Sequence, residues 1–142
     1  MTTRQTGGLL WGYKPPFTSQ RLKALAFTVC SSHIDLDKYI FWTLFLYDNL
    51  SKFYSNTNQA KLCFQTLDKA IQFTKTHSCT YFLDHYYFLY ATETRNNQGG
   101  WNEKSIDYLI QTHVFAKYLE NDTVLELTTN YLIELIPSFN WN

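Results

Sequence analysis

Apolar residues recur along most of the chain with the three- and four-residue spacing that marks one face of an α-helix. After residue 17 this spacing predicts six helices. The first four cover about residues 19–31, 35–54, 59–76 and 80–93. The fifth follows an N-cap at Asn102, and the sixth ends before Pro137, because proline cannot continue a helix.

The second predicted helix is apolar on nearly every side. One stripe combines Leu36, Tyr39, Ile40, Tyr47, Leu50 and Phe53, and a second combines Phe41, Trp42 and Phe45. A helix with apolar residues all round is usually buried by several neighbours. We therefore expect it to be the central helix of the fold.

The segment 80–93 is ambiguous because its aromatic residues favour strands, while the polar pair Asp84-His85 interrupts strict alternation. A helix also gives more ordinary loop lengths. The predicted fold class is therefore all-α, a single-domain bundle of about six helices, with an α+β fold carrying a strand near residues 80–91 as the alternative. Residues 95–100 are expected to form a loop that ends in Gly99-Gly100.

Residues 1–17 are predicted to form an irregular arm, since Gly7-Gly8, Gly12 and Pro15-Pro16 disfavour regular structure. The helical domain then covers residues 18–142, an ordinary size for one domain. The longest apolar run, residues 39–47, is much shorter than the roughly 20 residues of a membrane span, so no span is predicted.

The formal charge is zero, but residues 1–75 hold nine Lys/Arg and four Asp/Glu, whereas residues 76–142 hold three and eight. The simpler interpretation is attraction between the two halves of one fold, and the alternative is a basic surface for an acidic partner. Basic and aromatic side chains alternate near the N-terminus, and this mixture is typical of contact surfaces. The predicted binding residues are Arg4, Trp11, Tyr13, Lys14, Phe17, Arg21 and Lys23.

Candidate chemistry is sparse. The three cysteines, Cys30, Cys63 and Cys79, are odd in number and widely spaced, which favours reduced, structural thiols in an intracellular compartment such as the cytoplasm or nucleus. Cysteine and histidine come close together twice in the sequence, as Cys30 with His33 and as His77, Cys79 and His85. Neither group has the paired spacing of a zinc site, and His113 is expected to complete the core face of its helix.

No nucleotide-binding or catalytic motif is present, so the sequence predicts no catalytic set, metal or cofactor. The function that remains is a non-enzymatic helical module that contacts another protein or a second copy of itself. An aromatic content of 18% supports this, and a viral accessory protein or a subunit of a larger assembly are both of this kind. The first alternative is a nucleic-acid-binding protein that uses the basic N-terminal quarter, and the second is an enzyme with a histidine-based site.

Overall fold

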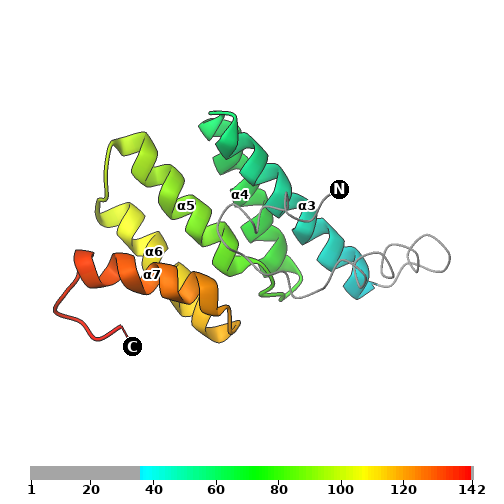
Figure 1. Ribbon diagram of the computed structural model, residues 1–142. Helices are drawn as coiled ribbons and strands as arrows, with labels where there is room; N and C mark the ends of the chain where they lie inside the picture. The colour runs from blue at the N-terminus through cyan, green and yellow to red at the C-terminus, as the bar shows by residue number, and fades with distance from the viewer. Residues whose placement is uncertain (1–35, 142) are drawn as a thin grey trace.

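The computed structural model describes residues 36–141, which form five α-helices joined by short connections (Figure 1). The helices are α3 (Leu36–Asn56), α4 (Ala60–Thr76), α5 (Leu83–Gln98), α6 (Glu103–Tyr118) and α7 (Asp122–Leu135). They confirm the all-α class and five of the six predicted helices. The first predicted helix and the N-terminal arm lie outside the described residues.

Each helix packs on the next one along the chain, so that α3 and α7 stand at opposite ends of the described array (Figure 1). Helix α5 lies between the two halves. It contacts α3 and α4 on one side and α6 on the other. One core cluster joins α3, α4 and α5 through residues such as Leu44, Leu67 and Tyr86. A second cluster joins α5, α6 and α7 through Phe88, Leu109 and Leu132.

Local sequence sets the helix ends. Asn102 accepts a hydrogen bond from the Ser105 backbone, and the Ser105 hydroxyl accepts one from the Asn102 backbone, which completes a capping box at the start of α6. Asn121 caps α7 in a similar way. Helix α5 is followed by its C-cap Gly99, whose φ of 76° is a left-handed conformation that glycine adopts without a steric cost.

Three expectations from the sequence need correction. The strand alternative for residues 80–91 is wrong, because residues 83–98 form α5. The loop expected at residues 95–100 begins later, since α5 continues to Gln98 before the glycines end it. The helix predicted to be central, α3, stands at one end of the described array, and α5 holds the middle position.

Candidate interaction surface

Helix α3 has two apolar faces with different environments. The inner face packs against α4 and α5, and it buries Ile40, Phe41, Leu44 and Phe45. The outer face carries large apolar side chains that remain exposed. The apolar pattern alone does not say which of the two faces points inward, so the contacts that fix the rotation of α3 decide what the surface presents.

Hydrogen bonds from α5 fix that rotation. The hydroxyl of the fully buried Tyr86 donates to the Leu44 backbone oxygen at 2.5 Å. Near the end of α3, the Ser55 hydroxyl donates to Glu93 Oε1, also at 2.5 Å. A buried polar group that loses its partner costs about 1–3 kcal/mol, so turning α3 about its axis is unfavourable.

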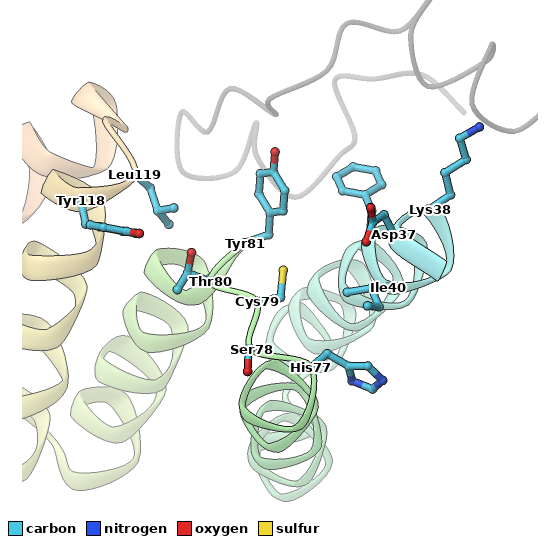
Figure 2. Close-up of a pocket in the computed structure, with 11 residues that line it drawn as sticks. Asp37, Lys38, Ile40, His77, Ser78, Cys79, Thr80, Tyr81, Tyr118 and Leu119 are labelled. Carbon is cyan, nitrogen blue, oxygen red and sulfur yellow. The ribbon is translucent and has the colours of Figure 1, made fainter. Parts of the chain in front are cut away.

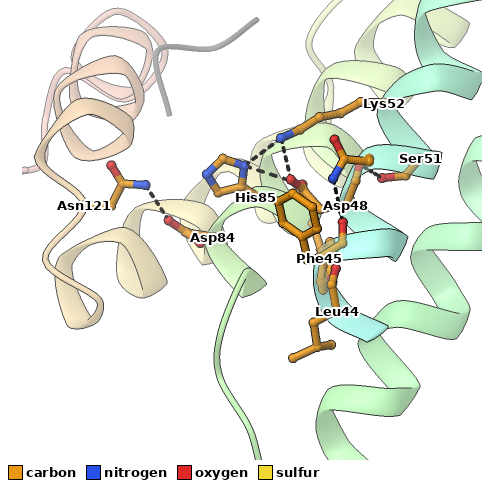
Figure 3. Close-up of polar contacts among 10 residues, drawn as sticks. Leu44, Phe45, Asp48, Ser51, Lys52, Asp84, His85 and Asn121 are labelled. Carbon is orange, nitrogen blue, oxygen red and sulfur yellow. Dashed lines mark hydrogen bonds and ion pairs between the residues drawn. The ribbon is translucent and has the colours of Figure 1, made fainter. Parts of the chain in front are cut away.

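A buried polar cluster adds a third link between these helices (Figure 3). The Lys52 Nζ atom donates to Asp48 Oδ2 at 2.7 Å and to His85 Nδ1 at 3.2 Å. His85 Nδ1 lies 3.6 Å from Asp48 Oδ1. The side chains of all three residues are at most 3% exposed.

Burial dominates the ionisation of this cluster. It raises the pKa of Asp48 and lowers the pKa of Lys52, while their mutual contact opposes both shifts. Burial, followed by the nearby charge of Lys52, holds the pKa of His85 well below its usual value, so the imidazole is neutral. Next to it, burial raises the pKa of Asp84, whose Oδ2 atom accepts a hydrogen bond from Asn121 at 2.8 Å.

The cluster holds helices together and does not have the geometry of a catalytic site. A general acid or base must reach a substrate, and these side chains are closed off from solvent. Cys63 is equally unsuited to act as a nucleophile, because burial and the charge of Glu93 raise its pKa to about 12.

On the outer face, six residues are spaced alternately three and four positions apart. We call them the α3 ridge: Leu36, Tyr39, Thr43, Leu46, Leu50 and Phe53. The five apolar members are 42–64% exposed. The alternating spacing is that of the a and d positions of a coiled coil, which form the seam between two helices. The one polar member, Thr43, donates its hydroxyl to the Tyr39 backbone oxygen at 2.8 Å. Its hydrogen-bonding need is therefore met within the helix.

The helix at the other end of the array, α7, has a different outer face. Its residues at four-residue intervals are Asp122, Glu126, Asn130 and Glu134, with Ile133 as a single exposed apolar neighbour. In stacked helical proteins, a polar outer face on the last element keeps the end of the stack soluble. Within residues 36–141, α7 meets this requirement and α3 does not. Of the two helices at the ends of the described array, α3 is therefore the one whose outer face is suited to a contact.

The residues predicted to bind partners, from Arg4 to Lys23, all lie outside the described residues, as do Cys30 and His33. The second predicted cysteine–histidine group does not come together. His85 lies in the core, whereas His77 and Cys79 line an open cavity of about 980 Å³ between the start of α3 and the end of α6. Figure 2 shows the His77 ring turned away from the Cys79 sulfur, and its Nδ1 atom lies 3.1 Å from the Phe73 backbone oxygen. Among residues 36–141, no three metal-binding side chains converge.

His113 lies where the sequence places it, on the core face of α6. Its Nδ1 atom is 3.1 Å from the Thr128 hydroxyl, and its ring makes a T-shaped contact with Trp141. Burial lowers its pKa. With Lys117 it lines a mainly apolar cavity of about 740 Å³ beside the C-terminal segment. This side chain completes the core face of α6, as the sequence predicts.

Two features escaped the sequence prediction, although each left a signal. Asp48 and Lys52 are oppositely charged residues at i, i+4 on a largely apolar helix, a spacing that allows an ion pair. Four of the six α3 ridge residues belong to a stripe predicted to be buried, yet the strict three-and-four spacing of the full ridge is the mark of a helix–helix seam.

Within residues 36–141, no helix is both long enough and apolar enough to cross a membrane. Comparison of the chain with protein-family models, with characterised proteins and with solved structures finds no match, so the site itself is the basis for assigning a function.

Proposed function

We propose that this protein is a non-enzymatic helical module that contacts another polypeptide through the α3 ridge. The observation that carries the proposal is the exposure of five large apolar side chains, in coiled-coil spacing, on a helix that its inner contacts hold firmly in place. Monomeric proteins rarely leave a contiguous apolar patch of more than a few hundred Å² in water, and larger patches mark interaction sites.

The composition of the ridge supports a protein partner. Leucine and aromatic side chains bury large apolar areas, and tyrosine is frequent at protein interfaces. The positions flanking the ridge add Trp42, Tyr47 and Tyr54, which are partly buried against the core and keep part of their surface available. A partner helix laid along the ridge would therefore meet an apolar strip with an aromatic border.

Site-specific photo-crosslinking tests the proposal. Leu46, in the middle of the ridge, is replaced by p-benzoyl-phenylalanine in the full chain, and the protein is irradiated in its native cells. The matched control carries the same group at Ile133, an exposed apolar position on α7. We expect an adduct with a second polypeptide from position 46 and none from position 133. A crosslink only to residues 1–35 of the same molecule, or no crosslink from position 46, would overturn the proposal.

A further inference from the structure

We infer that the partner of the α3 ridge is a second copy of this chain, packed against it as an antiparallel two-helix seam. This inference rests on the proposed function, because it names the partner of the same surface. Three properties of the ridge support it: its internal symmetry, the uncharged positions along its borders, and its area.

The first argument is the symmetry of the ridge. Consider two copies of α3 that run antiparallel about a two-fold axis between residues 44 and 45. Every residue at heptad position a of one copy then faces a residue at heptad position d of the other. The layers that result pair Leu36 with Phe53, Tyr39 with Leu50, and Thr43 with Leu46. Every ridge residue therefore faces a ridge residue of the second copy, and none is left without a counterpart. An isologous contact of this kind, in which the same patch serves both copies, is the commonest form of dimer.

Side-chain volume favours the antiparallel direction. In the antiparallel seam, the two largest ridge residues, Tyr39 and Phe53, each face a leucine, and the smallest, Thr43, does so too. A parallel seam would instead stack Tyr39 on Tyr39 and Phe53 on Phe53, and it would leave a gap where Thr43 meets Thr43. Helix seams pack best when large and small residues alternate, so the antiparallel layers fit more evenly.

The second argument concerns charge. Two identical helices bring like charges together if the positions beside the seam are charged, and this repulsion opposes self-association. In α3 these flanking e and g positions hold uncharged residues, namely Ile40, Trp42, Tyr47, Asn49, Tyr54 and Asn56. The uncharged residues that flank the ridge within α3 therefore do not repel a second copy.

The third argument is area. If each of the five apolar ridge side chains loses about 100 Å² of accessible surface, two copies bury about 1,000 Å², which reaches the lower limit for a specific interface. The bordering Trp42 and Tyr47 raise this figure further. The seam is thus large enough for a dimer that dissociates on dilution.

Analytical ultracentrifugation of the full chain tests the inference. We expect the apparent mass to rise with concentration from 16.8 kDa toward twice that value. Leu46→Glu should weaken the association at least about tenfold, because it places a charge in the central layers. Ile133→Glu, the matched control on α7, should leave the association unchanged. Circular dichroism checks that both variants keep the helix content of the parent.

A mixing experiment tests the direction of the seam. In the antiparallel arrangement, the new lysine of a Thr43→Lys chain faces the new glutamate of a Leu46→Glu chain, so the mixture should form a heterodimer, whereas neither variant should associate well alone. A parallel seam does not bring positions 43 and 46 together, and a failure to rescue overturns the antiparallel arrangement.

The outcomes separate this inference from the proposed function. A chain that stays monomeric at every concentration, while position 46 still crosslinks to a different polypeptide, overturns the dimer and leaves the proposed function standing. A dimer that Leu46→Glu does not weaken overturns the assignment to the ridge. A monomer whose Leu46→Glu variant melts at a much lower temperature indicates that the chain covers its own ridge, which overturns both.

Discussion

Stability should depend on pH through the buried cluster, and Lys52 should contribute to the size of that dependence. In the wild-type protein the pKa of His85 lies well below its ordinary value of about 6.5. The unfolded chain then takes up a proton that the folded chain does not, so stability falls as the pH drops below about 6.5. Between about pH 7.5 and 5.5 this single histidine costs about 1.4 kcal/mol of unfolding free energy.

Replacing Lys52 with methionine should weaken the effect. It removes the cation that lies 3.2 Å from His85 Nδ1, and it leaves the imidazole 3.6 Å from Asp48 with no opposing charge. The pKa of His85 should then rise toward that of an unfolded histidine, because the nearby cation is gone while burial, the larger cause of its depression, remains. The variant should therefore lose less unfolding free energy than the wild type over the same pH interval.

At about pH 7.5 the variant should be less stable by about 3–5 kcal/mol, since it leaves a buried carboxylate without its cation. The double variant Asp48→Asn/Lys52→Met, which removes both charges, should recover most of this loss. Urea unfolding followed by circular dichroism at both pH values measures all three proteins, and any contribution from His113 is common to them. A wild type as stable at pH 5.5 as at pH 7.5, or a Lys52→Met variant with the wild-type pH dependence, would refute the reasoning.

Three further predictions concern single positions. Asn102→Ala removes the capping box of α6 and should lower the unfolding free energy by about 1 kcal/mol, measured by urea unfolding. Glu120→Gly should raise the unfolding free energy by about 0.5–1 kcal/mol, because Glu120 holds a left-handed φ of 56° just after α6. Its negative charge there also opposes the helix dipole. An unchanged or lower melting temperature would contradict this prediction. Cys63 should stay unmodified by a thiol reagent in the native protein, because burial raises its pKa to about 12, whereas the half-buried Cys79 should react; labelling of Cys63 at the rate of the unfolded chain would contradict this.

The positions of the helices within residues 36–141 were predictable from local sequence. Helix boundaries depend on groups a few residues apart, such as the Asn102 cap, Gly99 and Pro137, and these act before any tertiary contact forms. The aromatic segment that forms α5 was the difficult case. Its β-forming residues pack well in a helix there because Tyr86, Phe88 and Leu89 reach cores on both sides.

The sequence could not determine which side of α3 faces the interior. Apolar residues surround this helix, so its periodicity is compatible with more than one rotation, and the prediction buried residues such as Leu50 and Phe53 that prove to be exposed. The rotation depends on partners far along the chain. The Tyr86 hydroxyl, 42 residues away, meets the Leu44 backbone, and His85, 33 residues away, meets Lys52. Buried polar groups must be paired, and only the folded chain brings these partners together; their pairing turns the ridge outward.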